Sequence, residues 1–167
     1  ITQLQRLYFL PGQKLHGPGA ADGILNTDFT SNAFSPKDLA LALDSTEILA
    51  VQLVSIERMV RTMVVRFERA ADWGLAAQLY EAVQQELELP APAVSVSGKD
   101  GYCLWFSLAD PVALALAAQF LQLLREAYLH ELQPAYLKFC PDSAASPEAF
   151  LNLPPALHPT SGKWSAF

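Results

Sequence analysis

The stretch from Ser97 to Gly101 has the residue types needed to bind an anionic group. Gly98 and Gly101 permit a tight turn whose backbone amides can approach a phosphate, while Ser97 and Lys99 add a hydroxyl and a positive charge. Asp100 opposes an anion, however, and an isolated stretch of this kind is more often an ordinary hairpin turn. The residues therefore leave two readings open, a phosphate-binding loop or a plain turn.

A second group of candidate residues follows from the alternation of side chains along strands. Arg66 and Glu68 share one face of one predicted strand, and Cys103 and Trp105 share one face of a later strand. The alternate residues of the two strands are more hydrophobic and are expected in the core; they are Val65 and Phe67 in the first strand and Tyr102, Leu104 and Phe106 in the second. We therefore expect a composite surface on the open face of a sheet, with a charge pair, a thiol and an indole.

Each of these side chains has a functional and a structural interpretation. Cys103 could be a reactive thiol, but no histidine is close in sequence to activate it, so a buried cysteine is favoured. Glu68 could be a general base or a metal ligand, although a strand-end glutamate near Arg66 is more often half of a surface ion pair. His158 could contact a nucleotide phosphate, or it could simply pack in a loop.

The elements that must position these residues have the predicted order β-α-β-β-α-β. The strands are predicted at residues 60–68, 93–97, 102–108 and 134–140, and the helices at 70–89 and from Asp110-Pro111 to the region of Leu124. The predicted core stripes of the two helices are Leu75, Leu79, Val83 and Leu87 in the first, and Val112, Leu116, Phe120 and Leu123 or Leu124 in the second. This order indicates an α+β fold with a ferredoxin-like, RRM-like core.

The rest of the chain extends this core in a single predicted domain, 1–167. Residues 1–34 are predicted as an irregular lead-in, followed by a short helix to about residue 43. Residues 47–56 form a hairpin partner that would extend the core sheet at 60–140. Residues 141–167 are predicted to be an irregular extension packed on the domain.

Composition limits the classes of function. Half of the 167 residues are hydrophobic and 17% are charged, which is typical of an ordered globular chain. The net charge of −6 argues against strong nonspecific binding of nucleic acid, because that binding depends on Lys and Arg at phosphates. Two cysteines are too few for a disulfide framework, and no apolar run is long enough for a membrane span, so we expect a cytoplasmic protein.

Three segments together resemble the archaeo-eukaryotic primase-polymerase superfamily. Its glycine loop reads Ser-Gly-basic-x-Gly-x-His before a strand that often includes Trp, and Ser97 to Trp105 matches except that Cys103 stands for the histidine. The family's first core strand usually ends in two metal-binding acids separated by one residue. Here Arg66 replaces the first acid and Glu68 matches the second. The third segment, 151–163, is similar to the family's Arg-x-Pro-x-x-x-His and Thr-Gly motif without its arginine.

The resemblance implies an ancestry and the departures imply its loss of activity. Arg66 puts a fixed positive charge where a cation would bind, so no metal or other cofactor is expected, and Arg66, Glu68 and Cys103 are vestigial positions. The expected function is a non-catalytic primase-polymerase-like domain that retains weak binding of a nucleotide or nucleic acid, or serves as an accessory protein. Its nucleotide-binding candidates are Ser97, Gly98, Lys99, His158 and Lys163.

Two alternatives stay open. One is an interaction module that forms a homodimer or binds a replication or repair protein, which the high hydrophobicity and low charge favour. The other is an enzyme with altered chemistry, which would need Glu68, Cys103 and His158 to converge.

Overall fold

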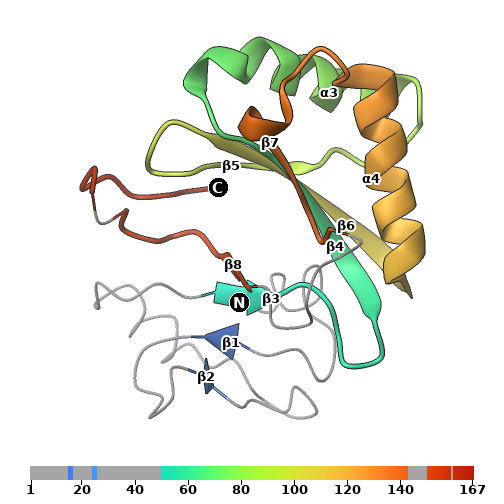
Figure 1. Cartoon of the computed structure of the whole chain (residues 1–167), viewed down its shortest axis with the longest axis horizontal. Helices are drawn as coiled ribbons and strands as arrows, with labels where there is room; N and C mark the ends of the chain where they lie inside the picture. The colour runs from blue at the N-terminus through green and yellow to red at the C-terminus, as the bar shows by residue number, and fades with distance from the viewer. Residues whose placement is uncertain (1–14, 17–23, 26–49, 143–149, 159) are drawn as a thin grey trace.

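Strand β4 (Met59–Phe67) is an inner strand of the larger of two antiparallel sheets. The computed structural model describes residues 15–16, 24–25, 50–142, 150–158 and 160–167. The larger sheet has the order β5-β6-β4-β7, with β5 at Ala93–Val96, β6 at Tyr102–Ala113 and β7 at Leu137–Cys140. With helices α3 (Trp73–Gln85) and α4 (Leu114–Tyr128) between the strands, the connectivity is β-α-β-β-α-β, and the predicted ferredoxin-like α+β core is confirmed (Figure 1).

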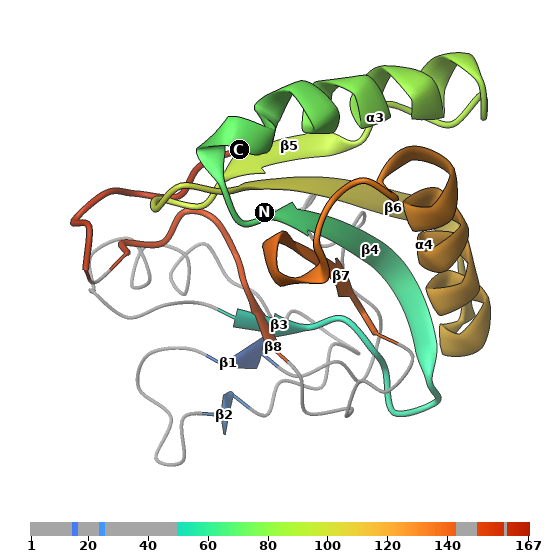
Figure 2. The same ribbon diagram turned by 45° about the horizontal axis from the view of Figure 1, so that its top comes forward.

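One face of this sheet forms the hydrophobic core with the two helices. Val65 and Phe67 of β4 and Leu104 and Phe106 of β6 alternate inward and are buried in the same cluster as Leu79 of α3 and other helix residues. Both helices lie on this side of the sheet (Figure 2). Short 3-10 turns, Ala70–Asp72 and Pro134–Tyr136, precede α3 and β7. The alternation predicted from the sequence is therefore correct for these two strands, and it leaves Arg66 and Cys103 on the opposite face.

The predicted extension of the core sheet by residues 47–56 is limited, over the described residues 50–56, to one bridge between Val54 and Val60 of β4. The chain turns between Ser55 and Met59, where the Ser55 amide donates to the Met59 carbonyl at 2.9 Å. The preceding strand β3 (Ala50–Gln52) then enters the smaller sheet, whose order is β2-β1-β3-β8, with β1 at Leu15–His16, β2 at Ile24–Leu25 and β8 at Phe150–Asn152. Strand β7 pairs only with Val64–Phe67 of β4, but β3 pairs with β1 and β8 instead of continuing along β4.

Both predicted helices have different boundaries in the structure. Helix α3 ends at Gln85 rather than Leu89, so Leu87 lies beyond it and is partly exposed. Asp110 and Pro111 do not cap α4 but lie in β6, where the pairing with β4 shifts register between Val60 and Thr62. A proline is tolerated at such an irregularity because it has no amide to contribute to the ladder.

The later start of α4 rotates its buried stripe relative to the prediction. The buried residues of α4 are Leu114, Ala117, Leu121 and Leu124, and Phe120 packs partly buried against the same core, so Phe120 and Leu124 of the predicted stripe are confirmed. Leu116 and Leu123, also expected in the core, are each 55% exposed. Helical spacing identified α4 as amphipathic, but only the position of its first turn decides which leucines face the sheet.

The terminal regions are described only in part. Strands β1 and β2 lie within the predicted irregular lead-in, and the predicted helix near residues 35–43 lies outside the described residues. In the C-terminal region, β8 pairs with β3, and Val96 of β5 forms a bridge with Ala166. None of the helices in the described part of the chain has the length and apolar character that crossing a bilayer requires.

Candidate functional site

A row of four side chains crosses the larger sheet on the face opposite the helices. Strand register pairs Ser95 with Cys103, Cys103 with Arg66, and Arg66 with Lys138. Directly opposed residues on antiparallel strands have Cβ atoms about 4.5–5.5 Å apart. The predicted proximity of Arg66 and Cys103 is therefore a consequence of the register. Lys138, which the sequence did not single out, joins them from the edge strand β7.

Glu68 lies just beyond β4 and faces two cations. Its Oε1 is 3.3 Å from an Arg66 guanidinium nitrogen and 3.6 Å from Lys138 Nζ. This oxygen is shielded from solvent and has no hydrogen bond of good geometry, so its contacts with the two cations are ionic. The Glu68 carboxylate is thus already neutralised by the protein itself, and the expected ion pair with Arg66 is present.

Burial suppresses the ionisation of the Cys103 thiol. Loss of solvation raises the pKa of Cys103 from 9.0 to about 11, against the opposing influence of the Arg66 charge and a hydrogen bond with Ser95. Burial likewise raises the pKa of Cys140. Since only the thiolate is a good nucleophile, the environment of Cys103 is that of a structural cysteine.

The glycine loop uses its serine to hold its own backbone. The Ser97 hydroxyl accepts hydrogen bonds from the amides of Lys99 at 3.2 Å and Gly101 at 3.0 Å, and the Ser97 amide donates to the Gly101 carbonyl. A side chain at Gly101 would collide with the Phe67 carbonyl at the end of β4. Two amides that could bind a phosphate are therefore directed at Ser97, which increases the part that side chains must play in binding an anion at this loop.

The C-terminal segment packs directly on this loop. Gly98 has φ +70°, and a Cβ there would lie 2.7 Å from the Lys163 carbonyl oxygen, so both its conformation and its contact favour glycine. Val96 and Ala166 exchange backbone hydrogen bonds of 2.8 and 3.3 Å. Two segments 65 to 70 residues apart in the sequence are thereby joined into one wall.

The same segment covers part of the sheet face that was expected to be open. Trp105 shares the face of Cys103 as predicted, but it is only 1% exposed, and its Nε1 donates to Ser95 Oγ at 2.8 Å. The Phe167 ring contacts the Trp105 ring, with centroids 5.4 Å apart. The prediction that Trp105 contributes to an exposed surface is therefore wrong, because the C-terminal residues cover it.

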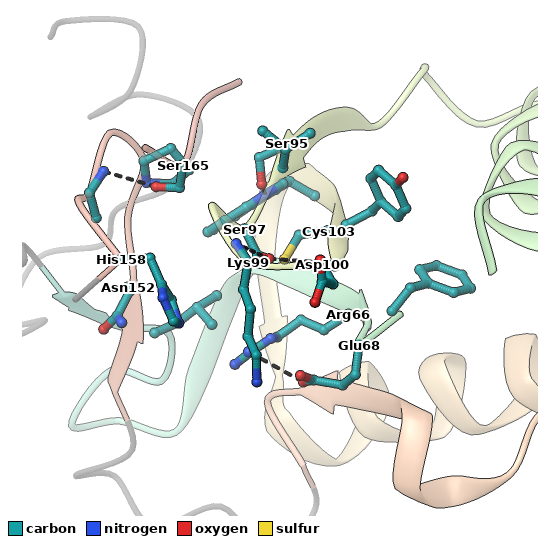
Figure 3. A pocket seen from close by; sticks show the side chains of 18 of the residues that line it. Arg66, Glu68, Ser95, Ser97, Lys99, Asp100, Cys103, Asn152, His158 and Ser165 are labelled. Carbon is teal, nitrogen blue, oxygen red and sulfur yellow. Dashed lines mark hydrogen bonds and ion pairs between the residues drawn. The ribbon is translucent and has the colours of Figure 1, made fainter. Parts of the chain in front are cut away.

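These segments enclose a cavity of about 420 Å³. Seven candidates from the sequence line it, and they are Arg66, Glu68, Ser97, Lys99, Cys103, Trp105 and His158. Gly98 and Lys163 do not line it, and the Lys163 side chain is exposed. Figure 3 shows the Arg66 and Lys99 side chains extending toward the space beside the Glu68 carboxylate, with His158 on the C-terminal segment across from them.

The charges lining the cavity nearly balance. Arg66 and Lys99 are cationic, whereas Glu68 and Asp100 are anionic. Among the residues that the structure describes, no three His, Cys, Asp or Glu side chains are grouped as a metal site. With Arg66 in the row and Glu68 bound to two cations, the residues do not fit the divalent cation of the primase-polymerase site.

Comparison with known proteins supports the fold and no more. No model of a known protein family matches the sequence, and no curated protein does. The structure is similar to the AEP domain of the cyanophage S-2L primase-polymerase, with a TM-score of 0.55 and 13% sequence identity over 98% of this chain and 84% of that chain. The chain has a primase-polymerase-like α+β fold, and its relation to that domain is distant.

Proposed function

We propose that this chain is a non-catalytic primase-polymerase-like domain that binds a nucleotide weakly in the cavity between the glycine loop and the C-terminal segment. One observation carries the proposal. Three segments that resemble the superfamily's motifs line the same cavity, which contains Arg66 in direct register with Cys103. The cavity volume lies within the range of about 300–1,000 Å³ that is usual for small-molecule sites.

The phosphates of the nucleotide are assigned to side chains of the cavity. Lys99 extends from the glycine loop, Arg66 extends from β4, and His158 lies on the opposite wall. Because Arg66 also pairs with Glu68, and Asp100 lines the same cavity, the electrostatic attraction between the cavity and a phosphate is modest. This supports weak binding, and it supports binding without a divalent cation.

The experiment is thermal unfolding with ATP, in the presence of Mg²⁺ and in the presence of EDTA. A ligand of the folded state stabilises the protein by RT ln(1 + [L]/Kd), so millimolar ATP should raise the melting temperature, equally in both conditions. Lys99→Met should abolish the shift. Lys163→Met removes the same charge from an exposed residue outside the cavity and should preserve it.

Two results would reject this function. If ATP gives no saturable shift, the cavity has no nucleotide role. If the shift requires Mg²⁺ or Mn²⁺, metal-free binding is wrong. The alternative of altered enzyme chemistry has less support, since the Cys103 thiol is kept protonated and Glu68 is held in ion pairs.

A second candidate function is self-association through α4. Exposed Leu116 and Leu123 lie on this helix, and Leu116 borders an apolar groove of about 350 Å³ whose lining includes Phe120 and the segment from Leu89 to Pro92. No charged residue lines this groove. Sedimentation at 5 to 200 μM protein tests it: a concentration-dependent mass that Leu116→Glu reverses supports a homodimer, and a constant monomer mass excludes one.

A further inference from the structure

Ser161 connects the C-terminal segment to the glycine loop. Its hydroxyl donates to the Gly98 carbonyl at 2.5 Å and accepts from the Lys163 amide at 3.3 Å. Hydrogen bonds to the backbone of a residue 63 positions earlier depend wholly on the tertiary structure. Ser161 is therefore placed to determine how the two walls of the cavity meet.

The same serine engages the His158 ring. The Ser161 amide donates to His158 Nδ1 at 3.3 Å, and Ser161 Oγ is 3.2 Å from that nitrogen. The turn between them is closed by hydrogen bonds from the His158 amide to the Lys163 carbonyl and from the Gly162 amide to the His158 carbonyl. The ring is thus held on its Nδ1 side by one residue.

This contact selects a proton position on the imidazole. A backbone N–H can only donate, so Nδ1 must accept, and the neutral ring then carries its proton on Nε2. The Ser161 hydroxyl has a single proton, which its short contact directs to the Gly98 carbonyl. Because His158 lines the cavity, its Nε2–H becomes a donor that suits an anionic oxygen there.

We propose that Ser161 is the positioning residue of this site, which fixes the His158 tautomer and holds the glycine loop in register with the histidine. The proposal deepens the nucleotide-binding function and rests on it. In this arrangement Lys99, on the loop, and His158, on the C-terminal segment, present their donors to the same phosphate. Loss of the Ser161 hydroxyl releases the loop and the ring from one another.

The first test is made without a ligand. In uniformly ¹⁵N-labelled protein, long-range ¹H–¹⁵N spectra report the tautomer of each histidine ring, amide spectra report the glycine loop, and a His158→Gln variant assigns the His158 signals. The wild type should show the Nε2–H form of His158. Ser161→Ala removes the hydroxyl but keeps the amide, so it should shift the amide signals of Gly98 and Lys99 and retain this tautomer, whereas Ser161→Thr, which keeps a hydroxyl, should resemble the wild type. Ser161→Pro removes the amide and should give a mixture of tautomers.

Thr160→Ala is the matched control, since it removes a hydroxyl from the exposed neighbour in the same turn. It should leave both the tautomer and the loop signals unchanged. If Ser161→Ala does not fold, Ser161→Cys is used in its place. This variant keeps a side chain of similar size but weakens the hydrogen bonds of the hydroxyl. Unchanged loop signals in a folded Ser161→Ala, or an unchanged His158 tautomer in a folded Ser161→Pro, overturn the positioning proposal.

The second test measures ATP affinity by calorimetry. Ser161→Ala should weaken ATP binding about 3- to 10-fold, the equivalent of one lost hydrogen bond, and Thr160→Ala should not. No ATP binding by the wild type rejects the nucleotide function, while the tautomer measurement still decides whether Ser161 positions His158. Changed loop signals in Ser161→Ala with unchanged ATP affinity overturn the assignment of Ser161 to ligand binding.

Discussion

Arg66 and Cys103 lie directly opposite one another on β4 and β6, and Glu68 follows on the same face. The sequence resemblance predicts that these positions correspond to an acid, a histidine and a second acid in the primase-polymerase superfamily. The register places Arg66 and Cys103 side by side, so the three positions form one location. In this chain that location contains an arginine, a thiol and a carboxylate, and the fixed positive charge of the arginine opposes a cation.

Arg66→Asp combined with Cys103→His should therefore create a site for Mn²⁺. The double variant brings two carboxylates and an imidazole onto one face, all of which are suitable ligands for this ion. Calorimetric titration with Mn²⁺ should show binding at least about tenfold tighter than that of Arg66→Asp alone, a difference of roughly 1.4 kcal/mol. A folded double variant with the affinity of the wild type would contradict the alignment of these positions with the metal-binding residues of the family.

The buried Cys103 thiol predicts a pH dependence of stability. Between its ordinary pKa of 9.0 and its folded value of about 11, the unfolded thiol loses its proton while the folded thiol keeps it. The folded state then binds more protons, so the free energy of unfolding falls as pH rises, by up to about 1.4 kcal/mol per unit. Relative to Cys103→Ser, the wild type should lose about 2 kcal/mol between pH 8 and pH 10.5.

Urea unfolding of both proteins at the two pH values, with reductant present, makes this measurement. Tyrosines and lysines titrate in both proteins and cancel in the difference. A stability difference between wild type and Cys103→Ser that does not change with pH would show that this thiol is not protected from ionisation.

At the scale of elements, the glycine loop and the C-terminal segment behave as one unit. Bonds from Val96 to Ala166 and from Ser161 to Gly98 join an edge strand to residues near the end of the chain. Within the loop, two amides donate to the Ser97 hydroxyl. Binding of a ligand therefore depends more on the Lys99 side chain and on the residues of the C-terminal segment across the cavity.

Helix α4 offers a direct test of which of its faces is buried. Leu121 is buried against the sheet, while Leu123, two residues later, is 55% exposed. Leu121→Ala should reduce the free energy of unfolding by about 2–4 kcal/mol, because it leaves a cavity in a packed core, and Leu123→Ala by less than about 1 kcal/mol. Chemical denaturation of the two variants measures both values, and equal losses would show that the helix is rotated from the orientation described.

For the whole molecule, the net negative charge favours binding of a single nucleotide over binding of a nucleic acid. The chain has 11 Lys and Arg against 17 Asp and Glu, and the cavity contains cations and anions in equal number. A single nucleotide needs only local contacts, whereas a polynucleotide gains affinity from many neutralised phosphates.

A fluorescent 20-nucleotide single strand should therefore bind with a dissociation constant weaker than about 10⁻⁴ M at 150 mM salt. Fluorescence anisotropy at 50, 150 and 200 mM salt measures this, with free fluorophore as the control. Micromolar affinity with a steep salt dependence would instead reveal a basic surface that the net charge conceals.

The sequence by itself determined the order of the core elements and the faces of its two inner strands. Alternation in residues 60–68 and 102–108 is a local property, and burial of one side of a sheet enforces it. The same local pattern identified Arg66, Glu68 and Cys103 as neighbours, and the short glycine stretch identified the loop.

Only the tertiary structure decided how these pieces combine. Strand β3 pairs with β1 and β8 in the smaller sheet rather than with β4, and Pro111 enters β6 because the β4–β6 ladder shifts register there. The cover over Trp105, the engagement of Ser97 with its own loop and the link from Ser161 to Gly98 are also invisible in the sequence. Each depends on hydrogen bonds or packing whose partners are set by the folded backbone, which local periodicity does not encode.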